Sequence, residues 1–382
     1  MAKKKIFIIA GENSGDMHGG NLVKAARSLD PEIEFFGLGG KQLEKAGTRL
    51  LANIVEKLAI IGFVEVIKNI HKILDLFKLV RKALKKEKPD AIILIDYPGF
   101  NIRVAKIAKE MGIKVIYYIS PQVWAWKKKR IFEIAKCVDK MMVVFPFEVE
   151  LYKNVGVDVE YVGHPLFDVM RLTMNKQTVC EKFGIDPNKP IVGLLPGSRN
   201  KEILALLSEM VHAAEIIKET MPDVQFVIPL ATTVSRSLVQ RIMNEVDVDI
   251  KVIDEFRYNV RSTFDFAIVV SGTATLETAF LNCPMIIVYK VAFLTWLIAK
   301  NIVNLPYIGL VNVVAGDMVV PELLQDEATA QKIADKTIRI LSDPEEIARI
   351  KYELTKIKVK MGGPGASKKA AAIVVDLVNK DR

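Results

Sequence analysis

The chain has 382 residues, 51% of them hydrophobic and 26% charged, a composition that excludes a disordered or fibrous protein. This length suits about two to three domains. Lysine and arginine outnumber aspartate and glutamate by 54 to 45, and the net charge of +9 indicates an anionic partner such as nucleic acid, a phospholipid surface or a phosphorylated substrate.

Cysteine and histidine usage narrows the chemistry. The three cysteines are far apart with no C-x-x-C pair, and the four histidines form no metal-binding spacing. We therefore expect a reducing cytosol and no metal. Glu12 and Asp16 interrupt the N-terminal apolar run too soon for a signal peptide. Neither Leu58–Ile67 nor Val291–Leu305 supplies the roughly 20 apolar residues of a membrane span.

Short apolar runs that end in glycine or proline turns alternate with segments of helical periodicity. Continuous apolar runs suit strands buried on both faces, so the pattern predicts an α/β fold with parallel sheets covered by helices. The expected strands are Ile6–Ala10, Ala91–Ile95, Lys114–Ile119, Lys140–Val144, Ile191–Leu195, Gln225–Leu230, Phe266–Val270 and Met285–Tyr289.

The apolar pattern lapses into a polar stretch between Val169 and Asn188, after which the alternation of strands and helices restarts. Two doubly wound, Rossmann-like domains explain this better than one sheet of a dozen strands. We place them at residues 1–168 and 169–345, followed by a C-terminal helical tail at residues 346–382.

The predicted tail contains two helices, Ile347–Met361 and Ala366–Val378. Asp343 is a plausible cap for the first, with Pro344 at the first helical position. The second helix has too little apolar surface to stand alone. We expect the tail to pack across a domain or a partner subunit.

The first predicted strand ends in Gly11-Glu12-Asn13-Ser14-Gly15-Asp16, ahead of a helix expected from about His18. Glycines at such a turn let main-chain N–H groups approach a ligand, and a helix N-terminus favours anions. Glu12 and Asp16 would repel a pyrophosphate, however, so the acidic pair favours binding of sugar hydroxyls or acceptance of a proton. The alternative is a tight turn in which Asp16 caps the helix.

Apolar residues recur at helical spacing from Val66 to Leu84, with lysines and arginines on the other faces. A basic amphipathic helix of this kind can lie on an anionic membrane, and an ordinary surface helix is the alternative. Trp124-Ala125-Trp126-Lys127-Lys128-Lys129-Arg130 also joins interfacial aromatics to a basic cluster. No recognised nucleic-acid motif accompanies it, so we do not expect a nucleic-acid partner.

Asp96 follows the expected strand Ala91–Ile95, within Ile95-Asp96-Tyr97-Pro98-Gly99-Phe100-Asn101. The carboxyl ends of strands in a doubly wound sheet face the ligand crevice, so we expect Asp96 to face the same crevice as Glu12 and Asp16. Helix capping is the alternative, although Asn101 is better placed to cap the helix that follows.

Two loops in the second predicted domain suit a nucleotide. In Leu195-Pro196-Gly197-Ser198-Arg199 the arginine can bind a phosphate through two N–H groups, and the glycine and serine offer main-chain donors. The main-chain amides of Ser271-Gly272-Thr273-Ala274-Thr275-Leu276-Glu277 suit a pyrophosphate, and Glu277 could accept hydrogen bonds from ribose hydroxyls. Either loop alone is as well explained by a Ser or Thr cap, but two in one domain favour a nucleotide site.

Asp247-Val248-Asp249 spells the D-x-D with which metal-dependent glycosyltransferases hold a divalent cation. It precedes the expected strand Ile250–Ile253 and does not stand at a strand's carboxyl end, so solvated turn charges are the favoured interpretation.

Seven motifs resemble, in this order, those of the lipid-A-disaccharide synthase family, and the resemblance covers essentially the whole chain. The G-E-x-S-G-D and S-P-x-V-W-A-W elements are its most specific parts. The motifs are Gly11 to Asp16, Ile95 to Asn101, Ser120 to Trp126, Gly163-His164-Pro165, Leu195 to Arg199, Ser271 to Glu277 and Leu310-Val311-Asn312.

This resemblance implies a two-domain glycosyltransferase of the GT-B type without a cofactor. Family members join UDP-2,3-diacylglucosamine to 2,3-diacylglucosamine 1-phosphate, giving a β-1′,6-linked disaccharide phosphate and UDP. They are peripheral proteins on the cytoplasmic face of the inner membrane of Gram-negative bacteria, and their C-terminal segment can exchange between subunits of a homodimer. Residues 1–168 would bind the acceptor and face the membrane, and residues 169–345 would bind the UDP-sugar.

The implied reaction inverts the anomeric carbon, which fits a single displacement. A base accepts the proton of the acceptor's 6-hydroxyl, while Arg199 and helix N-termini stabilise the departing UDP. The substrate contacts we expect are Glu12, Ser14, Gly15, His18, Asn101, Gly197, Ser198, Glu202, Ser271, Gly272, Thr273, Thr275, Glu277 and Asn312.

The base is the point at which this chain departs from part of the family. Some members carry an aspartate, itself a candidate base, where this chain has Gly99. Asp96 is therefore our first candidate and Asp16 the second, with Glu12 and His18 in support. The rival interpretations are another GT-B enzyme, such as a UDP-N-acetylglucosamine 2-epimerase, and a non-catalytic binding protein.

Overall fold

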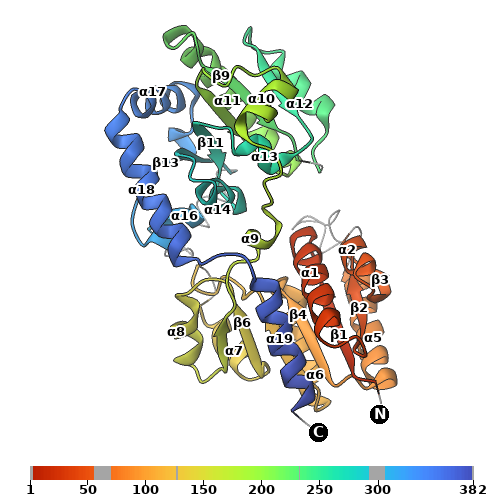
Figure 1. Cartoon of the computed structure of the whole chain (residues 1–382). Coiled ribbons are helices and arrows are strands. Elements are labelled where there is room, and N and C mark those ends of the chain that lie inside the picture. Colours follow the sequence, from red (N-terminus) through yellow and green to blue (C-terminus); the bar gives the residue numbers. More distant parts are fainter. Residues whose placement is uncertain (1–2, 56–69, 126–127, 232, 292–305, 381–382) are drawn as a thin grey trace. The chain divides into compact units, whose positions relative to one another are not determined.

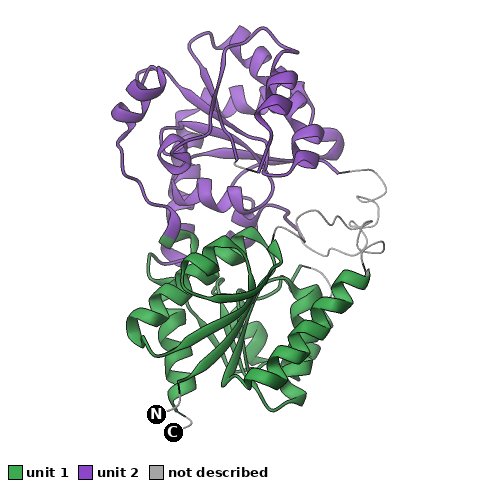
Figure 2. Ribbon diagram, turned by 90° about the vertical axis from the view of Figure 1, so that its right-hand side faces the viewer, with its two compact units in different colours: residues 1–168, 363–382 green, residues 169–362 purple. Residues whose placement is uncertain are grey.

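The computed structural model describes the chain outside residues 1–2, 56–69, 126–127, 232, 292–305 and 381–382 (Figure 1). It consists of two compact units, residues 1–168 with 363–382 and residues 169–362 (Figure 2). Each unit contains one parallel sheet flanked by helices. The predicted α/β class with two doubly wound, Rossmann-like domains is confirmed.

The first unit contains a seven-stranded parallel sheet in the order β3-β2-β1-β4-β5-β6-β7. Its strands are β1 (Lys5–Ala10), β2 (Glu34–Gly39), β3 (Arg49–Asn53), β4 (Ala91–Ile95), β5 (Lys114–Tyr118), β6 (Lys140–Val143) and β7 (Val159–Tyr161). Its helices are α1 (Asn13–Leu29), α2 (Lys41–Lys45), α5 (Ile70–Glu87), α6 (Pro98–Glu110), α7 (Arg130–Ala135), α8 (Glu148–Lys153) and α19 (Ala366–Asn379), and α9 (Leu166–Val169) spans the boundary.

The second unit contains a six-stranded parallel sheet in the order β10-β9-β8-β11-β12-β13. Its strands are β8 (Ile191–Leu195), β9 (Gln225–Pro229), β10 (Ile250–Ile253), β11 (Phe266–Val270), β12 (Met285–Tyr289) and β13 (Glu322–Leu324). Its helices are α10 (Lys176–Phe183), α11 (Asn200–Thr220), α12 (Arg236–Met243), α13 (Arg257–Arg261), α14 (Thr273–Phe280), α16 (Leu310–Ala315), the 3-10 helix Gln325–Glu327, α17 (Ala330–Leu341) and α18 (Pro344–Lys360).

In both sheets the chain winds outward from one central strand and then returns to that strand's other side. The reversal falls between β1 and β4 in the first sheet and between β8 and β11 in the second. In doubly wound sheets, ligands bind at this reversal, outside the carboxyl ends of the strands. The fold therefore marks two loop pairs, one in each unit, as candidate binding regions.

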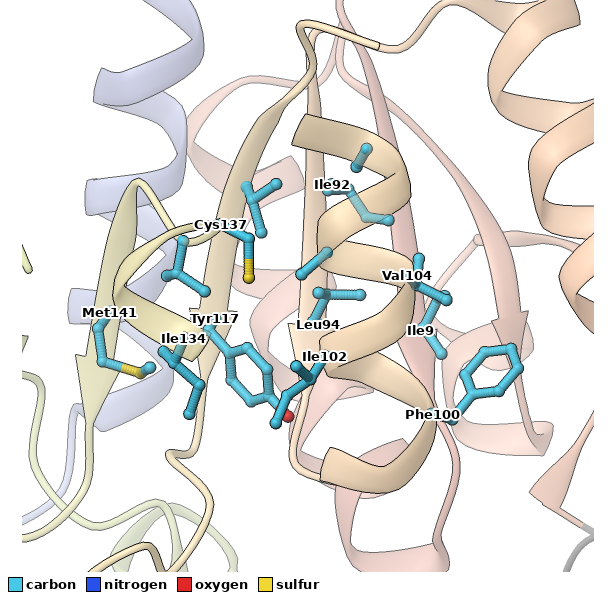
Figure 3. Packing of buried hydrophobic residues seen from close by; sticks show 14 of the residues in the cluster. Ile9, Ile92, Leu94, Phe100, Ile102, Val104, Tyr117, Ile134, Cys137 and Met141 are labelled. Atoms are coloured by element: carbon cyan, nitrogen blue, oxygen red, sulfur yellow. The ribbon is translucent and has the colours of Figure 1, made fainter. Parts of the chain in front are cut away.

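The apolar runs of the sequence become the buried central strands. All five residues of β4 are fully buried, and its side chains pack with those of β5 and α6 in the core of the first unit (Figure 3). The sequence did not predict β2, β3, β7 and β13. Two of these are three-residue strands, β3 is partly exposed, and β2 contains two glycines, so none gives a continuous apolar run.

The C-terminal segment is divided between the two units and does not form the separate tail expected at residues 346–382. Helix α18 belongs to the second unit, and the Asp343 carboxylate caps it by accepting hydrogen bonds from the main-chain N–H groups of Glu345 and Glu346. Helix α19 belongs to the first unit, where it packs along α1 (Figure 1). The chain passes from the second unit to the first between Gly362 and Gly363, and α19 packs across a domain as expected of the last helix.

Asp168 fixes the start of α19. Its carboxylate oxygens accept hydrogen bonds from the main-chain N–H groups of Gly365 at 2.6 Å and Ser367 at 2.7 Å. These N–H groups precede or open the helix and have no partner within it, so the carboxylate satisfies them from outside. These hydrogen bonds join the two segments of the first unit, residues 1–168 and 363–382.

Part of the predicted membrane-binding surface lies outside the described residues, namely residues 56–69, Trp126 and Lys127. The described part of the basic helix is α5, whose Val80 and Leu84 are buried in the core. Its exposed basic residues are Lys72, Lys78, Arg81, Lys82, Lys85 and Lys86. Among the described helices, none is both long and apolar enough to cross a membrane.

Candidate functional site

The first candidate region lies where β1 and β4 run side by side. Ala10 and Ile95 are register partners, so the loops that follow them, at Gly11–Asp16 and Asp96–Asn101, begin at the same edge of the sheet. Glu12 is exposed and Asp96 is half-buried. Their carboxyl groups are close enough for the charge of Glu12 to act on the pKa of Asp96.

Asp96 lies in a strained bend. Its φ is +46° and that of Tyr97 is +45°, a left-handed conformation that costs about 1–3 kcal/mol per residue outside glycine. The Tyr97 ring packs against Gly11, where a Cβ atom would lie 2.6 Å from the ring. Gly11 is thus required by the close approach of the two loops.

The pKa of Asp96 is raised from its ordinary value to about 7. Burial is the larger cause, the nearby charge of Glu12 is the second, and a main-chain hydrogen bond from Tyr97 opposes them. A carboxyl group with a pKa near neutrality can take up a proton from a reacting hydroxyl and hold it. The environment of Asp96 therefore suits a general base.

Asp16 has a structural role in this fold. Helix α1 begins at Asn13 and not near His18, so Asp16 lies inside its first turn and does not cap it. The buried carboxylate instead accepts hydrogen bonds from the N–H groups of Gly40, Gln42 and Leu43 at 2.7, 2.8 and 3.2 Å, which caps α2. Both oxygens are occupied by N–H donors, which argues against our second candidate for the base.

We expect Asp16→Ala to lower stability because it leaves the N–H groups of Gly40, Gln42 and Leu43, two of them buried, without their acceptor. The loss should be about 1–3 kcal/mol, measured by the thermal unfolding midpoint and by faster hydrogen exchange at Gly40 and Leu43. Glu12→Ala is the matched control, since this exposed carboxylate in the same loop makes no side-chain cap to α1. Wild-type stability in Asp16→Ala would contradict the structural role.

The other residues expected in this loop differ in accessibility. Ser14 is exposed, whereas Gly15 is buried with its Cα facing Ile95. His18 is buried beside His164, and burial together with the neighbouring His18 lowers the pKa of His164 to about 3. Both histidines are buried, so Glu12, Asn13 and Ser14 are the exposed polar side chains of this loop.

Asn101 does not cap the helix, contrary to expectation. Helix α6 begins at Pro98, with Tyr97 as its N-cap residue. The fully buried Asn101 amide instead donates hydrogen bonds to the carbonyl oxygens of Ile95 at 3.0 Å and Asp96 at 2.7 Å. The Asn101 amide nitrogen therefore holds the main chain of the bend, and the expected contact of Asn101 with substrate stays a prediction.

The S-P-x-V-W-A-W loop is anchored by a residue that the sequence analysis missed. Glu148 is buried and accepts hydrogen bonds from Trp124 Nε1 at 3.2 Å and from the Phe145 N–H group at 3.1 Å. Burial raises its pKa to about 8, against the opposing effect of these donors. Trp124 also packs edge-on against Phe145 and Phe147. The sequence signal that could have identified Glu148 is a charged residue directly after the aromatic run Phe145-Pro146-Phe147.

In the second unit, the glycine loop after β8 ends in an exposed arginine. Gly197 has a φ of +108°, and Arg199 Nη1 contacts Glu202 Oε1 at 3.2 Å. Glu202 Oε2 accepts the N–H groups of Ser198 at 2.9 Å and Arg199 at 3.2 Å. Of the main-chain donors expected to bind phosphate, that of Ser198 is thus held by Glu202, while the Arg199 side chain stays 74% exposed.

The loop after β11 adjoins the loop after β8, because β8 and β11 are neighbours. The Ser271 hydroxyl donates to the Ile308 carbonyl at 3.1 Å, and the buried Thr275 hydroxyl to that of Gly272 at 2.8 Å. Thr273 is exposed at the first position of α14. Tyr289, at the end of β12, has its pKa raised by burial, and the charges of Glu202 and Arg199 also act on it. The sequence analysis predicted the strand that ends at Tyr289 but did not name Tyr289 as a candidate site residue.

Two expected ligand contacts in this unit are occupied by protein groups. Buried Glu277 forms an ion pair with Arg261 and accepts a hydrogen bond from the Tyr258 hydroxyl at 3.0 Å, so its expected contact with ribose stays a prediction. Asn312 is fully buried, donates to Val320 and Glu322, and accepts from two main-chain N–H groups. In this structure both side chains stabilise the protein around the loops through these bonds.

The described residues contain no group of three or more His, Cys, Asp or Glu side chains arranged to hold a metal ion. Asp247 and Asp249 are exposed and precede β10, at the amino edge of the sheet. The D-x-D sequence thus stands at the edge opposite the loops described above.

Two Rossmann-like units in tandem, each with polar loops at its strand reversal, form the GT-B architecture that glycosyltransferases share with UDP-sugar epimerases. A family model described as Lipid-A-disaccharide synthetase matches residues 6–376. The chain belongs to this family.

Individual relatives agree with the family match. The lipid-A-disaccharide synthase of Geobacter sulfurreducens is 43% identical over 376 residues, which cover 98% of each chain. That of Coxiella burnetii is 39% identical over 378 residues, covering 99% of this chain and 100% of the relative. The crystal structure of a putative UDP-N-acetylglucosamine 2-epimerase from Listeria monocytogenes has a TM-score of 0.65 at 12% identity, over 100% of this chain and 97% of its own. This last likeness concerns the fold alone.

Proposed function

We propose that this protein transfers 2,3-diacylglucosamine from UDP-2,3-diacylglucosamine to the 6-hydroxyl of 2,3-diacylglucosamine 1-phosphate, releasing UDP. Family membership supports the substrates. The observation that carries the mechanism is the Asp96 carboxyl group, whose pKa is raised to about 7 at the strand reversal of the first unit.

In the proposed reaction, Asp96 accepts the proton of the acceptor's 6-hydroxyl as that oxygen attacks the anomeric carbon of the donor. The new C–O bond forms as the bond to UDP breaks, and UDP leaves with the electron pair. A single displacement inverts the anomeric centre and gives the β linkage. Glu12 tunes the pKa of Asp96 through its negative charge.

We propose that the second unit binds the diphosphate. The exposed Arg199 guanidinium retains N–H donors beyond its contact with Glu202, and the start of α14 offers main-chain N–H groups beside Thr273. These groups stabilise the negative charge that develops on the leaving UDP. No metal is required in this scheme.

We also propose that the protein binds peripherally to the cytoplasmic face of the inner membrane. The exposed basic side chains of α5 support attraction to an anionic lipid surface. We further propose that the protein forms a homodimer in which the two subunits exchange their C-terminal segments. In that dimer the Asp168 contacts to Gly365 and Ser367 would form between subunits.

The reaction is tested by incubating purified protein with both proposed substrates and EDTA, and following the products by mass spectrometry. We expect the disaccharide phosphate and UDP to form in the presence of the chelator, and Asp96→Asn protein provides the matched control. Product that requires added metal would contradict the metal-free scheme and direct attention to Asp247 and Asp249. Failure to form product under either condition would overturn the proposed function.

The rival 2-epimerase activity is separated by a parallel incubation with UDP-N-acetylglucosamine. The likeness to the Listeria structure extends to the fold but not to the sequence, at 12% identity. We expect no epimer. Its formation, without disaccharide in the first incubation, would favour the epimerase.

A further inference from the structure

The bend between β4 and α6 determines where the Asp96 carboxyl group lies. Asp96 and Tyr97 both have left-handed backbone conformations, which non-glycine residues rarely adopt. Two such residues in succession persist only where surrounding contacts hold them. Because the Asp96 side chain leaves the main chain inside this bend, any group that fixes the bend also fixes the carboxyl group.

Two buried donors hold the carbonyl oxygen of Asp96. The Tyr117 hydroxyl donates to it at 2.6 Å, and Asn101 Nδ2 at 2.7 Å. A carbonyl oxygen accepts two hydrogen bonds, so these donors saturate it. Asn101 also donates to the carbonyl of Ile95, which extends its hold to the last residue of β4. Both donors act on the main chain of the bend and leave the carboxyl group available.

Tyr117 is itself held rigidly. It is fully buried on β5, in the core that contains Leu94 of β4 and Ile102 of α6 (Figure 3). Burial raises the pKa of Tyr117 well above its ordinary value, so its hydroxyl remains a donor at working pH. The hydrogen bond therefore joins the bend to a side chain with little freedom to move.

We propose that Tyr117 is a positioning residue for Asp96, an inference that rests on the proposed role of Asp96 as the base. The Tyr117 hydroxyl and the Asn101 amide together keep the strained bend in the conformation that presents the carboxyl group. Removing the hydroxyl leaves one donor, so the protein folds but the carboxyl group is less well fixed.

The test is a double-mutant cycle of Tyr117→Phe and Asp96→Asn, with kcat and KM measured for both substrates. We expect Tyr117→Phe to lower kcat about 10- to 100-fold with KM unchanged, because misplacing a reacting group costs rate and not binding. Combined with Asp96→Asn it should cause no further loss, because it acts through Asp96. A normal kcat in Tyr117→Phe, or two losses that multiply, would overturn the proposal.

Tyr118→Phe is the matched control. It removes the hydroxyl of an adjacent, fully buried tyrosine whose side chain lies on the opposite face of the sheet, and we expect it to keep kcat. An equal loss in this variant would show that disturbing the core is sufficient and would overturn the specific role of Tyr117.

A crystal structure of Tyr117→Phe separates this inference from the proposed function. Movement of Asp96 out of its left-handed conformation supports the positioning role, even if Asp96→Asn retains turnover and the base assignment fails. An unchanged position of Asp96 and its carboxyl group would overturn the positioning role, whatever the outcome for Asp96→Asn.

Discussion

Asp96→Asn should reduce disaccharide formation to a small residual rate while UDP still binds. The amide has nearly the same shape as the carboxyl group but cannot accept the proton, and the loss of a general base costs about 10²–10⁴-fold in rate. Turnover is measured by product formation, and UDP binding by calorimetry. Near-normal turnover would eliminate Asp96 as the base.

Loss of folding would not explain such a result. The raised pKa of Asp96 means that the folded state binds this proton more tightly than the unfolded chain. The associated stability is therefore lost as pH rises from the ordinary carboxyl range through about 7. Asparagine carries no charge, so at pH 8 the variant should unfold at the same temperature as the wild type or higher.

The pH dependence of the same reaction provides a second check. The rate should rise through about pH 7, because Asp96 must be ionised to accept a proton. Glu12→Gln removes a negative charge that raises this pKa, so the midpoint should move to lower pH. A midpoint unchanged in Glu12→Gln would contradict the coupling between the two carboxyl groups.

Gly99 allows a comparison with the aspartate that the family resemblance implies for some members at this position. It lies in the first turn of α6, where a Cβ atom would have no neighbour within 4 Å, so Gly99→Asp should fold normally. We expect this variant to retain turnover when Asp96 is intact. Restoration of full activity by Gly99→Asp in an Asp96→Asn background would show that the base can act from either position.

Arg199→Ala should weaken UDP binding and slow transfer. Hydrogen bonds to a charged group contribute about 1.5–3 kcal/mol, which corresponds to roughly a 10- to 100-fold higher dissociation constant. The rate should fall further, by about 10²–10³-fold in kcat, if Arg199 also stabilises charge on the leaving group. Calorimetry with UDP and steady-state kinetics measure the two effects.

Two control variants show whether the effect is specific to the Arg199 guanidinium. Arg199→Lys keeps the charge but not the paired N–H geometry, and it should recover part of the lost affinity. Arg339→Ala removes an exposed arginine near the end of α17 and should change neither quantity. An unchanged UDP dissociation constant in Arg199→Ala would contradict the assignment.

The sequence predicted the central strands well because each buried strand is a continuous apolar run that can be recognised from its own residues. Ala91–Ile95, Ile191–Leu195, Phe266–Val270 and Met285–Tyr289 are continuous apolar runs and have the expected bounds in the structure. Edge strands such as β3 and β13 are short or partly exposed. Their pairing depends on neighbours brought from elsewhere in the chain, so local pattern could not reveal them.

The sequence by itself determined the α/β class, the loops that follow the central strands and, through its ordered motifs, the family. Only the tertiary structure decided which polar groups in those loops remain available. The Asp16 carboxylate accepts hydrogen bonds from N–H groups 24 to 27 residues away, and Glu277 forms an ion pair with Arg261. The Asp96 carbonyl accepts a hydrogen bond from a hydroxyl 21 residues away. A hydrogen bond is satisfied by whichever group the packed sheets bring within about 3 Å, and no local sequence pattern encodes that proximity.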